Sequence, residues 1–267
     1  MDAAQFEKTL ASVLSWWDEA GVETPPLAPA QKKRSGAHKR VPVKRDPLPS
    51  AKASAARSGP EAQAPPSEDS YAKSAADMAA KSKTLEDLKA GVEAFNAGTL
   101  SDAARGAVFS RGNPSAEIMI IGEAPGAPED AAGKPFIGPS GQLLDRIFAS
   151  IGLTEDSLYI TNVVNWRPPN NRKPTESEIA LCLPIIKRHI ALAKPRLIVL
   201  VGGVSMTALT GLKGITKTRG NWERLEVDGA AIPALITYHP AYLLRQPHLK
   251  RDVWRDMLSL KAKIAEL

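Results

Sequence analysis

The chain has 267 residues, 43% of them hydrophobic, and a formal net charge of +6. This length allows one large domain or two small ones with a sizeable core. One cysteine and four scattered histidines exclude a disulfide framework and argue against a structural zinc site. No apolar stretch is long enough for a membrane span, and the acidic N-terminus is untypical of a signal peptide, so we expect a cytoplasmic protein.

The basic residues are concentrated in the last third of the chain. Residues 181–267 contain 14 Lys and Arg against six Asp and Glu, a net charge of +8, whereas residues 1–110 carry +1 and residues 111–180 carry −3. Lys and Arg gain affinity for polyanions because they release the counterions of phosphates. A nucleic-acid partner and an ordinary solvated basic surface both account for this excess.

Three regions follow one another along the chain. Residues 1–22 carry large apolar side chains at helical spacing, which predicts an amphipathic helix. Residues 23–71 are rich in Pro, Ala, Ser and Lys, which predicts a disordered basic linker. Its stretch KKRSGAHKRVPVKR fits either a weak DNA tether or a solvated run of charge. Residues 72–267 have the pattern of a folded domain.

Four short runs rich in Ile, Val and Leu predict buried strands in this domain. They are Glu117–Ile121, Leu158–Val164, Arg196–Val201 and Ala234–Tyr238, and helical patterns cover residues 74–96, 141–151, 175–193, 204–211 and 247–264. Apolar strands that alternate with helices are typical of a parallel sheet covered on both faces. We therefore expect an α/β fold of three layers, with a four-stranded parallel sheet and helices on both faces.

Polar residues and glycines fall at the ends of these runs. The first run leads into Gly122 and Glu123, the second contains Asn162, the third leads into Gly202 and the fourth into His239. In an open parallel sheet, ligands bind at the carboxyl ends of the strands. The connection GEAPGAPEDAAGKPFIGPS is also far longer than the roughly two to six residues that usually join a strand to a helix. We therefore expect a functional site at this edge.

Three motifs resemble those of a known family. The stretches GEAPGAPEDAAGKPFIGPSGQLLD, YITNVVNWRPPNNRKPTESEIALC and TYHPAYLLRQP closely resemble the motifs of the family 4 uracil-DNA glycosylases. The resemblance covers residues 107–262, with the motifs in order. It implies an α/β fold with a four-stranded parallel sheet and the removal of uracil from DNA.

The resemblance assigns the chemistry to two residues. Hydrolysis of the N-glycosidic bond builds positive charge on the deoxyribose and negative charge on the leaving uracil, and groups already placed for these charges lower the barrier. His239, as a neutral imidazole, would donate a hydrogen bond to the uracil carbonyl. Glu123 would orient the water and stabilise the sugar cation. Backbone amides of the turn at Gly122 and Ala124 would help to hold the base.

Recognition of uracil follows from the same resemblance. The carboxamide of Asn162 would pair with N3 and O4 of uracil, whereas cytosine reverses both the donor and the acceptor. Phe136 would stack on the flipped base, although its position also fits an ordinary core residue. Glu129 lies where the family lines its pocket.

DNA contacts are expected in two loops. Asn171 and Arg172 belong to the RPPNNR loop near the DNA, and Leu243, Leu244 and Arg245 would enter the minor groove to fill the space left by the base. The leucines also fit an ordinary core. The expected partners are uracil-containing single- or double-stranded DNA and the abasic-site product. We expect a monomer that is associated with the nucleoid and not with a membrane.

The chain departs from the family in one respect. The family typically holds a [4Fe–4S] cluster with four cysteine thiolates. Here Cys182 is the single cysteine, and Trp166 stands at another ligand position, so we expect no metal and no cofactor. Trp166 is expected to fill the gap against the helix of Cys182 and residues 90–108. The stretch Asn165–Pro174 contains no histidine, which argues against the covalent bond to DNA that a related branch forms.

Two other functions stay open. One is a binding module that holds uracil or abasic DNA with little turnover, and the other is a glycosylase for another deaminated or mismatched base. The presence of Glu123, Asn162 and His239 favours turnover over binding alone. A dinucleotide-binding protein is disfavoured because no G-x-G-x-x-G motif follows the first strand.

Overall fold

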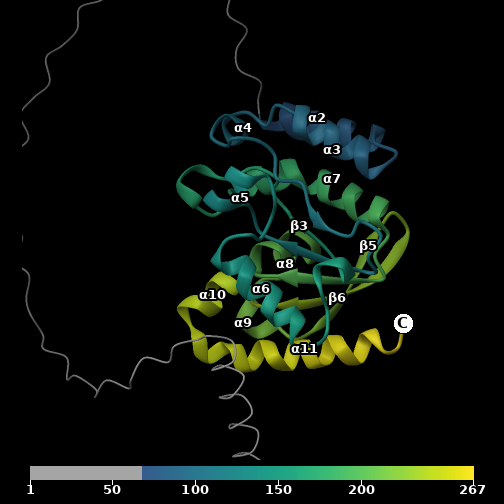
Figure 1. Cartoon of the computed structure of the whole chain (residues 1–267). Helices are drawn as coiled ribbons and strands as arrows, with labels where there is room; N and C mark the ends of the chain where they lie inside the picture. The colour runs from purple at the N-terminus through teal and green to yellow at the C-terminus, as the bar shows by residue number, and fades with distance from the viewer. Residues whose placement is uncertain (1–67) are drawn as a thin grey trace, which may run out of the picture. The chain divides into compact units, whose positions relative to one another are not determined.

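The computed structural model describes residues 68–267, and the helix and linker expected before residue 68 lie outside the described residues (Figure 1). The first described helix, α2, begins at Glu68. Residues 68–71, which the sequence pattern assigns to the linker, are therefore helical. Tyr71 packs against the hydrophobic core, a tertiary contact that composition does not reveal.

The sheet has six strands in the order β1-β3-β2-β4-β6-β5. The strands are β1 (Arg111–Gly112), β2 (Ile118–Gly122), β3 (Leu158–Asn162), β4 (Leu197–Val201), β5 (Trp222–Val227) and β6 (Ala230–Thr237). The central four, β3, β2, β4 and β6, are parallel, as predicted. The two edge strands are antiparallel and were not predicted.

Neither edge strand has the continuous apolar run by which the central strands were predicted, and the reason differs between the two. β1 is only two residues long, too short to show any periodicity. β5 has the sequence WERLEV and alternates polar with apolar residues, unlike the continuous apolar runs of the centre. A tight turn at Asp228 and Gly229, both with positive φ, joins β5 to β6 as a hairpin.

The five predicted helical stretches are present within residues 68–267, one of them divided into two helices, and four further short helices in the connections were not predicted. They are α2 (Glu68–Lys81), α3 (Leu85–Ala94), α4 (Thr99–Asp102), α5 (Ala127–Ala132), α6 (Pro139–Ala149), α7 (Glu176–Ala193), α8 (Gly203–Thr210), α9 (Ile215–Thr218), α10 (Pro240–Arg245) and α11 (Lys250–Ile264), with short 3₁₀ turns at η1 (Glu155–Ser157), η2 (Pro169–Asn171) and η3 (Pro247–Leu249). The pattern over residues 74–96 forms two helices because Thr84 caps α3 in a capping box with Asp87.

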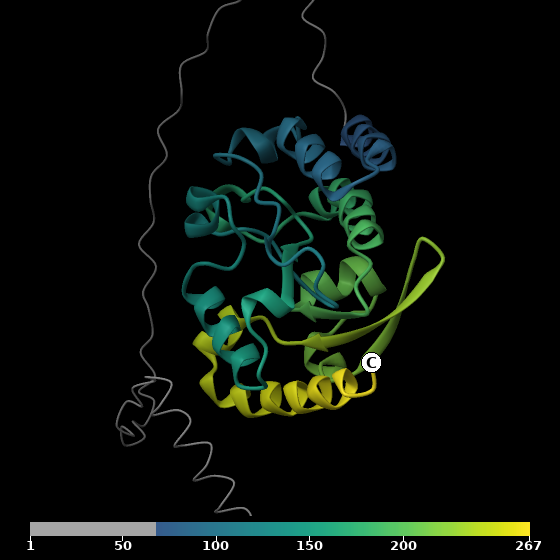
Figure 2. The same cartoon turned by 45° about the vertical axis from the view of Figure 1, so that its right-hand side comes forward.

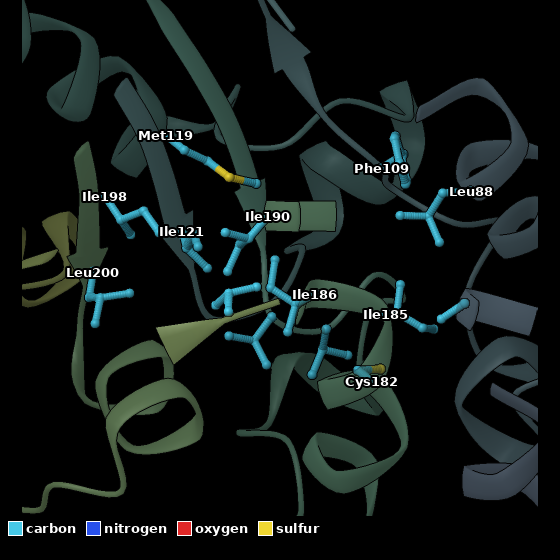
Figure 3. Packing of buried hydrophobic residues seen from close by; sticks show 14 of the residues in the cluster. Leu88, Phe109, Met119, Ile121, Cys182, Ile185, Ile186, Ile190, Ile198 and Leu200 are labelled. Atoms are coloured by element: carbon cyan, nitrogen blue, oxygen red, sulfur yellow. The ribbon is translucent and has the colours of Figure 1, made fainter. Parts of the chain in front are cut away.

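The helices cover both faces of the sheet (Figures 1 and 2). α7 covers one face, and α2 and α3 pack on α7. Figure 3 shows Ile186 and Ile190 of α7 near Ile121 of β2, with Cys182 and Ile185 farther toward Leu88, and all of them belong to one buried cluster.

On the other face, α6 and α11 pack against the opposite side of the same strands. Leu144 and Phe148 of α6 and Met257 of α11 lie in a second buried cluster with Ile118 and Ile120. Alternate residues of β2 thus point into different clusters, which is why the central strands are unbroken apolar runs in the sequence. No helix within residues 68–267 has the length and apolar character required to span a bilayer.

Candidate active site

The carboxyl ends of the four parallel strands meet at one edge of the sheet. Gly122, at the end of β2, pairs with Asn162 at the end of β3, and Val201 of β4 pairs with Thr237 of β6. His239 follows Thr237 closely and is the N-cap residue of α10. The sheet therefore brings together the strand-end residues that the sequence pattern singles out.

Gly122, Phe136 and Asn162 are in close contact. A Cβ atom on Gly122 would lie 2.3 Å from Cζ of Phe136 and 2.4 Å from Oδ1 of Asn162, so only a residue without a side chain fits. Asn162 is 2% exposed. Within residues 68–267 its Oδ1 has no hydrogen-bond partner. Because a buried polar atom without a partner is costly, this oxygen is suited to accept from a ligand N–H group.

His239 is held as a neutral hydrogen-bond donor. Its Nδ1 accepts a hydrogen bond of 3.2 Å from the backbone amide of Ala241, which leaves the proton of the neutral ring on Nε2. Burial lowers the pKa of His239 to about 4, and the positive charge of Arg245 acts in the same direction while Glu129 opposes it. The imidazole is therefore uncharged at neutral pH.

Two neighbours fix the place of the His239 ring. Gly202, with φ +103°, lies so close that a Cβ on it would be 3.0 Å from Cβ of His239. On another side the ring of Phe136 lies with its centroid 5.6 Å from that of the imidazole. The glycine after β4 and the aromatic residue after β2 thus both pack on His239.

Glu123 follows Gly122 and is half-buried. Burial raises the pKa of this carboxyl, and the positive charge of Lys173 opposes the shift. The backbone carbonyl of Glu123 accepts a hydrogen bond from the amide of Val164, so the turn after β2 stays joined to the chain that follows β3. The carboxyl of Glu123 therefore lies in a partly desolvated position directly after β2.

Glu129 is occupied by the backbone of its own loop. One carboxylate oxygen accepts from the amide of Gly126, and the other accepts from the amides of Ile137 and Gly138. The sequence interpretation placed Glu129 among the uracil-binding residues. In the structure its carboxylate shapes the loop that carries Phe136, because three backbone donors converge on it.

Ala124, also expected beside the base, is half-buried and packs against the core cluster on the α7 side of the sheet. Its side chain therefore anchors the turn, and only its backbone is available to a ligand at this edge.

The RPPNNR loop forms η2 and is exposed at its tip. Asn171 has a positive φ of 54°, and its Oδ1 accepts a hydrogen bond of 2.6 Å from Nε of Arg167. Arg172 makes a bidentate ion pair with Glu178 in the first turn of α7. The guanidinium that the sequence interpretation assigned to DNA is thus already paired with a carboxylate, and it also fixes the end of the loop.

The three residues of α10 that were expected to enter the minor groove differ in their exposure. Leu243 is fully buried in the core, so its assignment to the DNA-inserting group is corrected. Leu244 is 47% exposed, and Arg245 is exposed with its guanidinium 6.0 Å from the centroid of the Tyr242 ring. Successive residues of an α-helix point in directions about 100° apart, so the two leucines lie on different faces of α10.

Trp166 occupies the place of a family ligand as a core residue. It is 2% exposed and belongs to the same buried cluster as Cys182, Ala97 and Leu100. Its ring lies 6.2 Å from that of Phe95. The expected packing of Trp166 against residues 90–108 is confirmed by its contact with Phe95, and Trp166 shares the buried cluster with Cys182 of α7.

The residues present do not fit an iron–sulfur cluster. Cys182 is the one cysteine of the chain, and burial raises the pKa of its thiol to about 12. The thiol lies within reach of the backbone amide of Asn165. Asn165 also exchanges hydrogen bonds with the backbone of Val108, so main-chain contacts join the segments that a cluster would cross-link.

Two basic residues near these loops were not among the predicted site residues. Lys173 acts on the charge of Glu123. Arg167 donates to Asn171 and also forms an ion pair of 3.7 Å with the buried Asp130. The run of bases in RPPNNRK was the available signal, but their partners lie far away in the sequence.

The fold and the site define an α/β protein of the doubly wound class, with an aromatic ring, a buried carboxamide and a neutral imidazole at the carboxyl edge of its parallel strands. The family model described as the uracil DNA glycosylase superfamily matches residues 109–258. The chain belongs to this superfamily.

Its relatives include several type-4 uracil-DNA glycosylases. The protein of Pyrobaculum aerophilum is 40% identical over 158 residues, which make up 57% of this chain and 81% of the relative. That of Saccharolobus solfataricus is 40% identical over 167 residues, or 60% of this chain and 77% of the relative. That of Sulfurisphaera tokodaii is 39% identical over 187 residues, or 67% of this chain and 84% of the relative.

Proposed function

We propose that the protein is a uracil-DNA glycosylase that flips uracil out of DNA and hydrolyses its N-glycosidic bond. The observation that carries this proposal is the buried Oδ1 of Asn162, which has no partner among the described residues and lies beside the ring of Phe136. The similarity to type-4 uracil-DNA glycosylases supports the same function.

Asn162 would select uracil by its pattern of donors and acceptors. N3–H of uracil would donate to Oδ1, and Nδ2 would donate to O4 of uracil. Cytosine presents an acceptor at N3 and a donor at N4, so both groups of the amide would face a like group. Mispairing of buried polar groups discriminates strongly between substrates. The ring of Phe136 would stack on the flipped base.

His239 and Glu123 would act on the charges that develop during cleavage. The bond between C1′ and N1 breaks, and its electron pair leaves with uracil. Nε2–H of His239 would donate a hydrogen bond to the uracil carbonyl as this oxygen becomes negative. Glu123 would stabilise the positive sugar and orient the water, whose oxygen bonds to C1′ and whose proton passes through the carboxylate to solvent.

Contacts with the DNA would come from the exposed residues near this edge. Leu244 and Arg245 at the end of α10 and Asn171 in η2 are exposed in the structure. We place Leu244 in the space that the flipped base leaves. The protein would act as a monomer on uracil-containing DNA, at the nucleoid in the cytoplasm, and leave abasic DNA as product.

The test measures free uracil released from single- and double-stranded oligonucleotides that contain one uracil, under single-turnover conditions. Release of uracil and an alkali-labile site at that position are expected. Matched oligonucleotides with thymine, cytosine or hypoxanthine at the same position provide the control for base choice.

Two results would contradict the proposal. Tight binding of uracil DNA without release of base would indicate a binding module. Faster release of a base other than uracil would indicate a glycosylase with another substrate.

A further inference from the structure

The backbone of Phe136 adopts a conformation that is unusual for an aromatic residue. Its φ is +54°, although it is buried and carries a bulky side chain. Such a residue in the left-handed region is uncommon and is held there by its surroundings. Gly141 of α6 leaves room for this conformation, because a Cβ atom there would lie 1.8 Å from the carbonyl oxygen of Phe136.

A buried guanidinium group donates hydrogen bonds to the backbone carbonyls of this segment. Arg111 of β1 is 8% exposed, and its Nε donates to the carbonyl of Pro135 at 2.9 Å. Nη2 donates to the carbonyl of Phe136 at 3.2 Å. The charge of Arg111 is balanced by Asp145 at 2.5 Å and Glu155 at 3.4 Å, two carboxylates that are half-exposed.

A carboxylate group accepts hydrogen bonds from the backbone amides of the same segment. Oε1 of Glu129 accepts from the amides of Ile137 and Gly138, at 3.1 Å and 2.8 Å. Arg111 and Glu129 therefore form a clamp on the peptide groups around Phe136, with a cation on the carbonyls and an anion on the amides. Charged partners make such hydrogen bonds stronger than neutral ones.

We propose that Arg111 is a positioning residue for base recognition: it sets the ring of Phe136 over Gly122, Asn162 and His239 before a base arrives. The proposal rests on the proposed function for the stacking role of Phe136. Arg111 itself touches the backbone of the Phe136 segment and acts on the base only through that segment.

The requirement is for arginine and not for positive charge alone. The planar fork of the guanidinium reaches two carbonyls and two carboxylates at once. A lysine ammonium is a compact point charge and cannot span these four partners. Arg111→Lys should therefore restore only part of what Arg111→Met loses.

The experiment compares Arg111→Met and Arg111→Lys with the matched control Arg196→Met. Arg196 likewise pairs with a carboxylate, Glu117, and with a backbone carbonyl, that of Leu267, but these partners belong to other segments than the one around Phe136. Single-turnover uracil release, DNA affinity and thermal unfolding are measured for each.

We expect Arg111→Met to lower the single-turnover rate by about 10- to 100-fold, since misplacement by about 1 Å costs about that much. DNA affinity should change by less than the rate, because the proposed DNA contacts, Asn171, Leu244 and Arg245, are unchanged. Arg111→Lys should fall between Arg111→Met and wild type, and Arg196→Met should keep the wild-type rate.

A second readout does not depend on activity. The Phe136 ring lies 5.6 Å from His239, so the proton resonances of the imidazole carry its ring-current shift. Arg111→Met should move these resonances, and Arg196→Met should not. If the wild type releases no uracil while the resonances still move, the proposed function fails and the positioning role stands.

Gly141→Ala tests the premise of the proposal, that the position of the Phe136 segment matters, if Arg111→Met does not fold. An added methyl group must push the Phe136 carbonyl away without removing any charge, so the same loss of rate and the same resonance shifts are expected. Wild-type rates and unmoved His239 resonances in a folded Arg111→Met or Gly141→Ala variant would overturn the proposal.

Discussion

The rings of Phe136 and His239 lie with their centroids 5.6 Å apart and their planes tilted by 31°. Phe136 comes from the loop between α5 and α6, and His239 follows the end of β6. Burial of the imidazole is the main cause of its lowered pKa. The residue proposed to stack on the base and the residue proposed to donate a hydrogen bond to it are therefore in direct contact.

His239 should control the chemical step and its pH dependence. His239→Ala should lower the single-turnover rate by about 10²- to 10³-fold, as expected for the loss of one oxyanion donor. The neutral ring is the competent form, and its pKa is lowered from 6.5 to about 4. The wild-type rate should therefore stay constant as the pH falls from 8 to 6 and decrease only at lower pH. A rate that halves near pH 6.5 would contradict this assignment.

Asn162 should govern the choice of base. Asn162→Ala should lower the rate on uracil by about 10²-fold or more, since a site built on hydrogen bonds loses much when a partner is absent. Asn162→Asp keeps an acceptor but removes the donor to O4, so uracil release should fall with the fold intact. Competition between uracil and cytosine oligonucleotides measures this preference. Equal rates for both Asn162 variants and wild type would remove Asn162 from the site.

The two leucines of α10 should behave in opposite ways. Leu244→Ala should lower the rate on double-stranded DNA more than on single-stranded DNA, with the unfolding temperature unchanged, because Leu244 is exposed. Leu243→Ala should instead lower the free energy of unfolding by about 2–5 kcal/mol, because Leu243 is fully buried. Chemical denaturation and the two substrates separate these effects. Reversed outcomes would contradict the orientation of α10.

Trp166 should stabilise the fold where a cluster would otherwise do so. Trp166→Ala should lower the free energy of unfolding by about 3–5 kcal/mol, the usual loss for a buried aromatic residue. Cys182→Ala removes only a small buried thiol and should keep the wild-type rate. The purified protein should be colourless. Brown protein with stoichiometric iron would show that this account of Trp166 is wrong.

His189 should make the fold sensitive to acid. It is buried, its Nε2 lies 2.8 Å from the hydroxyl of Tyr159, and burial lowers its pKa from 6.5 to about 3. The unfolded state therefore binds one more proton between pH 6.5 and 3, so this contribution to stability is present above pH 6.5 and is lost progressively below it. The pKa of His239 is also lowered by burial, so His239 likewise makes the free energy of unfolding decrease as the pH falls.

The variant His189→Phe isolates this contribution. Below pH 6, the free energy of unfolding of the wild type should fall more steeply with pH than that of His189→Phe, by about 1.4 kcal/mol per pH unit. Denaturant titrations between pH 4 and 7 measure both slopes. Parallel slopes would contradict the assignment.

The order and spacing of apolar runs determined the central architecture. Strands β2, β3 and β4 and the second half of β6 are buried on both faces, so local hydrophobicity alone marked these four strands. The rule that parallel strands gather their carboxyl ends at one edge then placed Gly122, Asn162 and His239 together. These features depend on neighbours in sequence or on a general property of parallel sheets.

Only the tertiary structure decided what the individual polar and exposed groups do. Arg111 grips Phe136, Glu129 is occupied by three backbone amides, and Leu243 is buried while Leu244 is exposed. Each outcome depends on partners from distant segments and on the direction in which a side chain leaves its helix or loop. Residue type sets which bonds a side chain can make, and the folded neighbourhood sets which of them it does make.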